Sequence, residues 1–353
     1  MSPRIKKIVL ATVAVVATLL ITEGVLRLKT PPTFLQSSPW STVWPWVVTD
    51  PVLGWANSGG FENKSFRINS DGLRGAEISR EKPEGTIRIV CIGDSGTFGV
   101  WFGVRSGRHW DSYPEELGWI LKESGYRNVE VINAGVVGYT SSHTLRQLMT
   151  KVLKLKPDIL IARTGFNDIA DLGNKFFRDY YIKEPPGFLI GSLMYHWPES
   201  RLVRLAAWLD RKLVSMSVKD NKNVVSHEEF RANLERIIEA SEENGIDLVF
   251  IDYPLRDPDT GLNGQERYLT EYYGVETLLE FHQKHRAYQK ILSEVARDRG
   301  VRIVDTAGAM GKFPGTTYSE YDFVHPNASG ARIVAREVFT ALQELGLLKT
   351  DEN

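Results

Sequence analysis

Short apolar segments alternate with longer amphipathic ones from residue 87 to residue 346, and this pattern constrains the fold more than any other feature. The apolar segments predict β-strands over residues 87–93, 129–135, 158–162, 246–254 and 301–305. The amphipathic segments predict helices over residues 112–125, 143–157, 228–245, 280–300 and 328–346. Neighbouring parallel strands need a crossover connection, usually a helix. The alternation therefore predicts an α/β fold: a three-layer α/β/α sandwich around a flavodoxin-like, five-stranded parallel sheet.

The first amphipathic segment carries its own boundary signals. Ser112 and Glu115 stand three residues apart and predict a capping box at the start of the helix. Gly125 follows the last apolar residue, and glycine is the residue type that most often ends a helix. These local signals agree with the alternation.

The N-terminus departs from ordinary globular composition. Residues 1–7 are basic, and residues 8–22 are uncharged and almost wholly apolar. With the following residues to 28, the segment is close to the length that spans a bilayer. Two interpretations stay open. We favour an uncleaved transmembrane signal anchor, because no small-x-small cleavage pattern follows the run; the alternative is a cleaved signal peptide. In both cases the basic flank stays in the cytoplasm and the rest of the chain is exported.

Two segments without regular periodicity separate this apolar run from the first predicted strand. Residues 29–48 are rich in proline, serine and tryptophan and are predicted to be a juxtamembrane linker. Trp40, Trp44 and Trp46 in this linker lie either at the lipid interface or against the domain. Residues 49–86 contain turn signals and are predicted to be an irregular extension.

The predicted catalytic domain, residues 87–347, contains one connection that is longer than a compact fold needs. Residues 171–225 join the third strand to the next long helix. Their aromatic content favours a lid or a binding insertion over disorder. The segment SRLVRLAAWLDRKL within it is amphipathic and basic, and it either packs on the domain or touches the membrane surface.

Composition disfavours several classes of function. The formal net charge is −1, so no basic excess recommends a nucleic-acid partner. The only cysteine, Cys91, lies inside an apolar strand and is predicted to be a buried packing residue. No Cys/His spacing fits a zinc site, so no metal is predicted.

The first predicted strand ends in Gly-Asp-Ser-Gly, which places Ser95 at the carboxyl edge of the sheet, where ligands bind in open α/β sheets. A serine hydroxyl becomes nucleophilic beside a base, and the base needs an orienting acceptor. His325 is the candidate base, and Asp322, three residues earlier, is its candidate acceptor. Both precede the last helix and therefore belong to the same edge. These residue types predict acyl transfer through a serine nucleophile.

Acyl transfer also needs hydrogen-bond donors for the oxyanion that develops in the transition state. The second strand is followed by Gly138, whose backbone N–H is accessible because no side chain intrudes. The third strand is followed by Asn167, whose side-chain amide can donate. The backbone N–H of Ser95 is the third candidate donor.

Further polar residues follow the same strands. Arg163 ends the third strand and is a candidate contact for an anionic or sugar substrate; His143, shortly after Gly138, is a second candidate substrate contact. Asp94 and Asp168 neighbour candidate catalytic positions and are assigned to hydrogen bonding within their loops. The other histidines are predicted to be surface or packing residues: His109, His196, His227, His282 and His285.

Four short motifs, in this order, resemble those of the SGNH, or GDSL-type, hydrolases. They are GDSGTFG with Ser95, NAGVVG with Gly138, GFND with Asn167, and DFVH with Asp322 and His325. The resemblance covers roughly residues 85–345. Each motif alone is common, but all four in order, at strand ends or before the last helix, are specific.

The segment before the first strand carries a second resemblance. FRINSDGLRGAEI is similar to the N-terminal portion of membrane-anchored SGNH proteins from bacterial surface-polysaccharide contexts. Asn69 and Arg74 in this segment are candidates for bracing the mouth of the site. The resemblance implies a single-pass protein of a bacterial cytoplasmic membrane with its catalytic domain on the extracytoplasmic side.

The resemblance implies a serine esterase that needs no cofactor and acts on an acetyl or acyl ester of a carbohydrate or lipid. Ser95 is then the nucleophile, His325 the base, Asp322 its orienting acceptor, and Ser95, Gly138 and Asn167 the oxyanion donors. Two alternatives stay open. An O-acyltransferase would pass the acyl group to an exported polysaccharide, and a catalytically silent protein would bind carbohydrate or serve in assembly.

Overall fold

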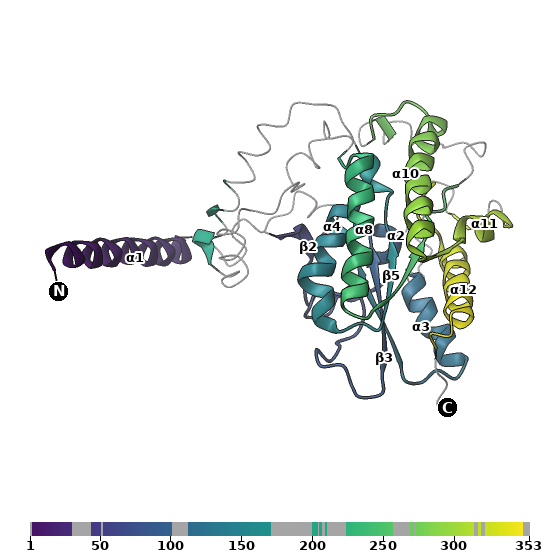
Figure 1. The fold of residues 1–353 in the computed structure, drawn as a ribbon, viewed down its shortest axis with the longest axis horizontal. Helices are drawn as coiled ribbons and strands as arrows, with labels where there is room; N and C mark the ends of the chain where they lie inside the picture. Colours follow the sequence, from purple (N-terminus) through teal and green to yellow (C-terminus); the bar gives the residue numbers. More distant parts are fainter. Residues whose placement is uncertain are drawn as a thin grey trace. The chain divides into compact units, whose positions relative to one another are not determined.

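The structure is a computed structural model, and it describes residues 2–29, 44–50, 52–100, 112–170, 200–203, 205–206, 209, 224–256, 269–270, 273–313, 317–318 and 322–348. The chain divides into two compact units, which are drawn together in Figure 1. Unit 1 comprises residues 1–56 and 178–219. Unit 2 comprises residues 57–177 and 220–353 and contains the sheet that was predicted.

Unit 1 begins with the long helix α1 (Pro3–Lys29). Its segment Ile5–Lys29 is long and apolar enough to cross a membrane, with a mean hydropathy of 2.3 in its most apolar window. A two-stranded sheet follows, with β1 (Val47–Asp50) and β2 (Gly54–Asn57), whose last residue belongs to unit 2.

The tryptophans of the predicted linker pack inside the protein where they are described. Trp44 and Trp46 are buried, and their rings meet edge to face with centroids 5.1 Å apart. Trp40 lies outside the described residues.

The central sheet of unit 2 has five parallel strands, which confirms the predicted architecture. They are β3 (Ile87–Gly93), β4 (Val129–Gly135), β5 (Ile159–Arg163), β6 (Asp247–Ile251) and β7 (Arg302–Val304). Their spatial order is β4-β3-β5-β6-β7, the doubly wound flavodoxin-like order. The order reverses direction at β3, so the carboxyl ends of β3 and β5 form the crevice where this fold class binds ligands.

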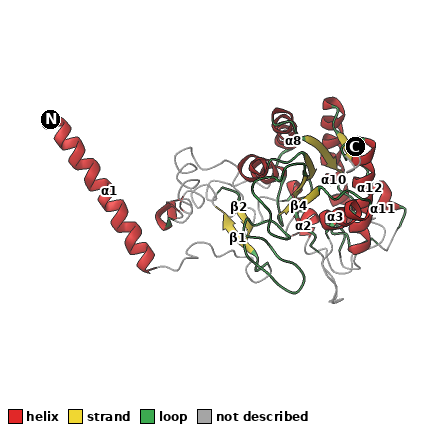
Figure 2. Cartoon of the chain, turned by 90° about the horizontal axis from the view of Figure 1, so that it is seen from below, coloured by secondary structure: helices red, strands yellow, loops and turns green. Residues whose placement is uncertain are grey.

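Helices cover both faces of the sheet (Figure 1). One layer consists of α4 (Ser141–Gln147), α8 (His227–Glu243) and α10 (Leu278–Arg299), and the other of α3 (Tyr113–Glu123), α11 (Thr306–Gly311) and α12 (Ala328–Glu344). Figure 2 shows the strands of unit 2 between these two groups of helices.

Every second side chain of a strand points to the same face of the sheet, and this alternation determines which residues enter the core. Ile89 and Cys91 of β3 belong to the cluster that also holds Leu117 of α3 and Val338 of α12, all buried. Burial raises the pKa of the Cys91 thiol to about 12, which agrees with the predicted packing role. The predicted capping box of α3 is present, since the side chains of Ser112 and Glu115 bond each other's backbone.

One predicted helix differs in form from the expectation. The helix expected over residues 143–157 begins at Ser141 as α4 and continues as a π-helical turn (Leu148–Val152) and a 3₁₀ turn (Leu153–Leu155). It ends at Lys156, which adopts a left-handed conformation with φ 53°. A hydrophobic pattern with helical spacing does not distinguish these helix types.

The extension at residues 49–86 is more ordered than expected. Besides β2 it forms isolated antiparallel bridges, one of which joins Arg74 to Asn133 of the edge strand β4, with Arg74 N–H donating to Asn133 O at 3.0 Å. The extension thus covers part of an exposed sheet edge, which would otherwise present unpaired backbone groups. Most of the predicted insertion at residues 171–225 lies outside the described residues.

Candidate active site

Ser95 lies where β3 turns into the short helix α2 (Ser95–Phe98). Gly93, the last residue of β3, has φ 151°, and a Cβ there would lie 2.3 Å from Arg163 O on the neighbouring strand. Only glycine fits this turn. Asp94 then caps α2, since its side chain accepts from Gly96 N–H at 2.9 Å. The strand therefore ends on Gly-Asp-Ser-Gly because each residue has a distinct steric or capping task around the serine.

Three residues from two distant segments form a continuous hydrogen-bonded chain. His325 Nε2 lies 2.7 Å from Ser95 Oγ, and His325 Nδ1 lies 2.8 Å from Asp322 Oδ2. The other carboxylate oxygen, Asp322 Oδ1, accepts from the backbone N–H groups of Val324 at 2.9 Å and His325 at 3.0 Å. All three side chains are buried. The aspartate is thereby fixed by its own turn, and the imidazole is fixed by the aspartate.

The candidate oxyanion donors follow three neighbouring strands. Within the described residues, neither Ser95 N–H nor Gly138 N–H has a hydrogen-bond partner. Gly138 has φ 79°, a conformation that favours glycine. Asn167 differs, because its Nδ2 donates to Asp94 Oδ2 at 3.2 Å and to Tyr139 O at 3.0 Å. The two backbone donors are therefore available to a ligand, whereas the amide of Asn167 is already engaged.

Asp94 joins the nucleophile turn to the end of β5. Besides Gly96 N–H and Asn167 Nδ2, it accepts from Tyr253 Oη at 2.8 Å. Burial raises the pKa of the Asp94 carboxyl, and the nearby Arg163 guanidinium opposes that shift. Burial also raises the pKa of Tyr253 well above its ordinary value, so its hydroxyl stays protonated and donates. Tyr253 was missed in the sequence; the available signal was its place just after β6, at the same sheet edge.

Asp168 is a second buried carboxylate beside the site. Its oxygens accept from Ser141 N–H at 3.1 Å and from the Ser141 hydroxyl, which also accepts from Asn233 Nδ2 at 2.9 Å. Burial raises the pKa of Asp168 to about 7, against the effect of these hydrogen bonds. The assignment of Asp94 and Asp168 to hydrogen bonding around their loops agrees with these contacts.

Arg163 and His143, the two candidate substrate contacts, lie in the interior, and neither side chain has any exposed surface. The Arg163 guanidinium lies 4.0 Å from the ring centroid of Tyr253, under the turn that carries Ser95. His143 stacks on Tyr139 with centroids 5.0 Å apart, and its Nδ1 lies 2.8 Å from Thr140 Oγ1. Burial lowers the pKa of His143 well below its ordinary value. Both side chains are thus buried next to the candidate site.

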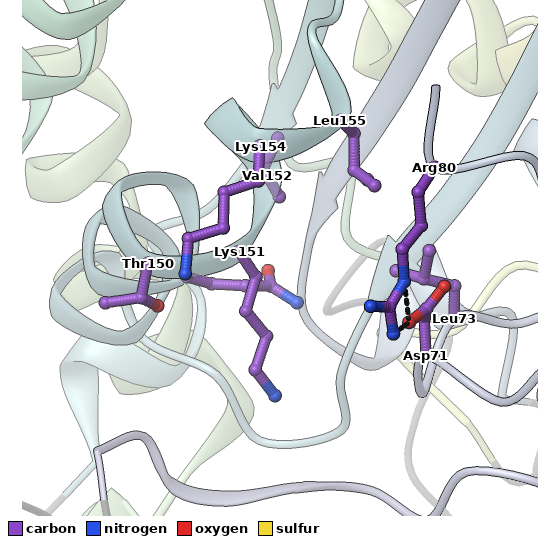
Figure 3. Close-up of a pocket in the computed structure, with 9 residues that line it drawn as sticks. Asp71, Leu73, Arg80, Thr150, Lys151, Val152, Lys154 and Leu155 are labelled. Carbon is purple, nitrogen blue, oxygen red and sulfur yellow. Dashed lines mark hydrogen bonds and ion pairs between the residues drawn. The ribbon is translucent and has the colours of Figure 1, made fainter. Parts of the chain in front are cut away.

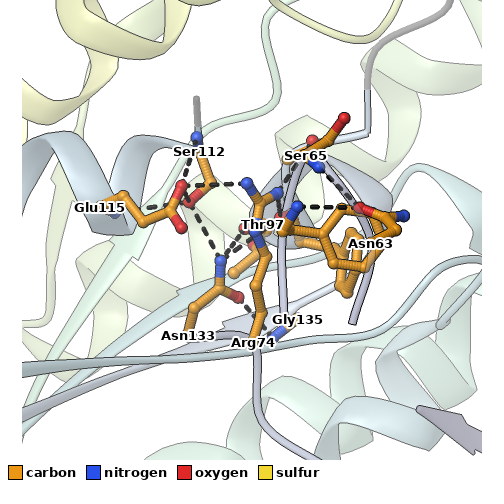
Figure 4. A network of polar contacts seen from close by, with 11 residues as sticks. Asn63, Ser65, Arg74, Thr97, Ser112, Glu115, Asn133 and Gly135 are labelled. Carbon is orange, nitrogen blue, oxygen red and sulfur yellow. Dashed lines mark hydrogen bonds and ion pairs between the residues drawn. The ribbon is translucent and has the colours of Figure 1, made fainter. Parts of the chain in front are cut away.

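Arg74 supports the opposite end of α2. Its guanidinium donates to the carbonyls of Phe98 and Gly99, the latter at 3.1 Å, and pairs with Glu115 at 3.0 Å. Asn133 adds a donor to Thr97 O at 3.0 Å. Figure 4 shows these side chains converging on one point between the extension, α3 and β4. Arg74 thus braces the helix that follows Ser95, whereas Asn69 bonds within its own turn.

A cavity of about 300 Å³ lies away from this site, between the extension and the turns that follow α4. Figure 3 shows the Asp71–Arg80 ion pair on one wall and Lys151 and Lys154 on the other. None of the candidate catalytic residues lines it. In the described part of the chain, no group of three or more His, Cys, Asp or Glu side chains is placed to hold a metal ion.

Comparison with known proteins places these observations in a family. The sequence profile of the GDSL-like lipase/acylhydrolase family matches residues 91–333. A similar solved structure is a lipase/acylhydrolase from Enterococcus faecalis, with 19% identity, a TM-score of 0.47, and coverage of 76% of this chain and 100% of that one. Another is a catalytic mutant of the acetylxylan esterase Axe2 from Geobacillus stearothermophilus, with 18% identity, a TM-score of 0.45, and coverage of 75% and 97%.

A similar curated protein is described as the uncharacterized lipoprotein YqeF of Bacillus subtilis. It is 35% identical over 88 residues, which are 24% of this chain. The match spans about a third of that relative's length (33%).

Proposed function

The chain belongs to the GDSL-like lipase/acylhydrolase family and is an ester hydrolase, and we propose that it works as a serine esterase tethered to a bacterial cytoplasmic membrane. Its substrate is an acetyl or longer acyl ester of a carbohydrate or lipid outside that membrane. The observation that carries the catalytic assignment is the buried chain of contacts from Ser95 Oγ through His325 to Asp322.

In the first step Ser95 Oγ attacks the ester carbonyl, and His325 Nε2 takes the hydroxyl proton across the 2.7 Å contact. Asp322 holds Nδ1 protonated, which leaves Nε2 as the basic nitrogen and stabilises the imidazolium that forms. His325 then gives the proton to the leaving alcohol oxygen as the C–O bond breaks, and an acyl-enzyme on Ser95 remains.

The negative charge that develops on the carbonyl oxygen is stabilised by Ser95 N–H and Gly138 N–H. Asn167 is the third donor. An amide group has two N–H hydrogens, and both are directed at Asp94 and Tyr139 in this state. Asn167 therefore reaches the oxyanion by exchanging or sharing one of these bonds when substrate is bound.

Water completes the reaction. His325, neutral again after the alcohol leaves, removes a proton from a water molecule that attacks the acyl carbonyl. His325 then returns that proton to Ser95 Oγ as the bond between Oγ and the acyl carbon breaks and the carboxylic acid leaves. These steps use the side chains already named, and the proposal assigns no cofactor.

The proposed location of the reaction is supported by α1. Its apolar segment is long enough to span a bilayer, and Lys6 and Lys7 lie at its start. Basic flanks stay in the cytoplasm, which directs the C-terminal catalytic unit to the other side. Esters on exported carbohydrates or on envelope lipids are the substrates present there.

The test uses the full chain in detergent and p-nitrophenyl acetate, butyrate and octanoate, with and without sugar acceptors. We expect hydrolysis in the wild type and loss of roughly 10⁴-fold or more of kcat in Ser95→Ala. The chain-length profile sizes the acyl pocket, and acylated sugar found by mass spectrometry would redirect the proposal to an O-acyltransferase. Equal rates in the wild type and Ser95→Ala would contradict the assignment of the nucleophile.

A further inference from the structure

We propose that Arg163 is a positioning residue, a buried cation that keeps Asp94 ionised and so fixes the turn that carries Ser95. This inference rests on the proposed role of Ser95, and it gives Arg163 a task other than the substrate contact expected from the sequence.

The buried guanidinium of Arg163 lacks a full set of acceptors. The residue has no exposed surface, and its Nε and Nη2 have no hydrogen-bond partner within the described residues. Its visible contact is with the face of Tyr253, at 4.0 Å from the ring centroid. A buried cation without acceptors is costly, so a nearby negative charge is needed to offset its desolvation.

The position of the guanidinium is directly under the nucleophile turn. A Cβ on Gly96 would lie 2.7 Å from Arg163 Nη1 and 2.7 Å from Tyr253 Oη. Arg163 also pairs in register with Gly93, the last residue of β3. The guanidinium and the phenol therefore form the surface on which the Gly93–Gly96 turn rests.

The negative charge that faces this cation is Asp94. Its three hydrogen-bond partners among the described residues all donate to it: Gly96 N–H, Tyr253 Oη and Asn167 Nδ2. Three groups that can donate to the carboxylate favour its ionised form, because a protonated carboxyl would lose one of these bonds or reverse the one to Tyr253 Oη. These bonds tie together the serine turn and one candidate oxyanion donor.

The charged and titratable groups around Asp94 come from several elements. Arg163 belongs to β5, Tyr253 follows β6, His325 precedes α12, and Asp168 lies beside Asn167. Burial raises the Asp94 pKa, and Arg163 is the first of the influences that lower it. Removal of the cation therefore raises the Asp94 pKa, and the carboxyl stays protonated to a higher pH.

The first test measures the coupling between Arg163 and Asp94 by thermal unfolding and needs no enzyme assay. We expect Arg163→Met to lower the unfolding temperature, and to lower it more at pH 8 than at pH 5, because the folded Asp94 then resists ionisation more strongly than the unfolded one. In an Asp94→Asn background the same substitution loses this pH dependence. A destabilisation by Arg163→Met that is the same at both pH values, with either residue at position 94, would overturn the inference.

The second test reads the same coupling in catalysis. We expect Arg163→Met to lower kcat by about 10-fold or more at pH 6 with little change in KM, and to move the acid limb of kcat/KM to higher pH by about one unit. Arg163→Lys keeps the charge, so we expect the acid limb of its kcat/KM profile to stay at the wild-type pH. If the acid limb of Arg163→Lys shifts as far as that of Arg163→Met, charge is excluded as the cause. The Asp94→Asn double variant tests whether the shift of the acid limb passes through Asp94, because only a shift of that origin disappears there.

Arg88→Met is the matched control. Arg88 is also fully buried in the sheet, but it bonds at the opposite edge to Glu130, Leu155 O and Ser79 O. We expect it to lower stability without moving the acid limb. If Arg163→Met does not fold, Tyr253→Phe keeps the ring and removes only the donor to Asp94; it should move the limb the same way by less, and an unmoved limb would overturn the inference. A wild type that hydrolyses no ester refutes the proposed function and leaves the stability test decisive for Arg163.

Discussion

The central sheet has one buried arginine at the amino ends of its strands (the amino edge) and another at their carboxyl ends (the carboxyl edge). The two side chains differ in their hydrogen bonding. At the amino edge, Arg88 of β3 donates from Nε to Glu130 at 2.7 Å, from Nη1 to Leu155 O at 2.7 Å and from Nη2 to Ser79 O at 2.8 Å. At the carboxyl edge, Arg163 of β5 has no acceptor for Nε or Nη2 within the described residues. Both side chains have no exposed surface.

The difference in hydrogen bonding indicates that Arg88 serves stability and that Arg163 serves the chemistry of the site. Each guanidinium nitrogen of Arg88 has an acceptor, and these bonds tie the extension to the segment before β5. A buried cation that lacks hydrogen-bond acceptors interacts electrostatically with the groups around it. For Arg163 these groups are Asp94 and the nucleophile turn. Functional sites retain such unsatisfied groups at a cost to stability. The comparison predicts that substitutions at the carboxyl edge change rates or pH dependence, with or without a loss of stability, whereas those at the amino edge change stability alone.

The largest effect is expected for Asp322→Asn, at the carboxyl edge. The amide cannot hold His325 in the tautomer that leaves Nε2 basic, because it presents an N–H as readily as an oxygen to Nδ1. We expect kcat to fall by roughly 10³-fold or more, while thermal unfolding shifts by only a few degrees. Near-normal hydrolysis in this variant would show that the Asp322–His325 contact is structural.

The next effect concerns the amino edge. Arg88→Met leaves Glu130 and two backbone carbonyls without their donor, and we expect a loss of about 3 kcal/mol in the free energy of unfolding. Glu130 is partly exposed, which places the loss at the low end for a broken buried pair. Urea unfolding measures the loss, and ester hydrolysis per folded molecule should equal that of the wild type. A fall in kcat larger than the fall in folded fraction would break the distinction between the edges.

The smallest effect concerns the pH dependence of stability at the carboxyl edge. The Asp168 pKa is about 7 in the folded chain, above its ordinary value of 3.8, so the folded state holds this proton more tightly than the unfolded state. Its contribution is therefore fully present below pH 4 and is lost as the pH rises toward 7. We expect Asp168→Asn to be least destabilised, relative to the wild type, at pH 8. Thermal unfolding at pH 5 and pH 8 checks this, and a difference that is equal at both values would contradict it.

The sheet was predictable because its determinants are local. β3 and β4 match the predicted ranges because each is a short apolar run that ends on glycine. The parallel direction of the strands was predictable from the helices that connect them. The π-helical turn at Leu148–Val152 was not predictable, since its hydrophobic spacing is the same as that of an ordinary helix.

The candidate site was predictable where a residue type has few uses at a strand end. Ser95, Asp322 and His325 are brought together as expected, although 230 positions separate the serine from the histidine. The residues that pack behind the candidate catalytic side chains were not predictable. Arg163 lies under the nucleophile turn and against the ring of Tyr253, a residue that is far away in sequence. Burial of an arginine is a property of the tertiary packing and cannot be read from its neighbours in the chain.

The central claim is that Ser95 is an activated nucleophile held by His325. The most direct measurement is covalent labelling of the full chain by a fluorophosphonate, with the modified peptide located by mass spectrometry. The account predicts one adduct, on Ser95, whose rate of formation falls at least about 100-fold in His325→Ala. An adduct on another residue, or equal labelling rates in the wild type and His325→Ala, would contradict it.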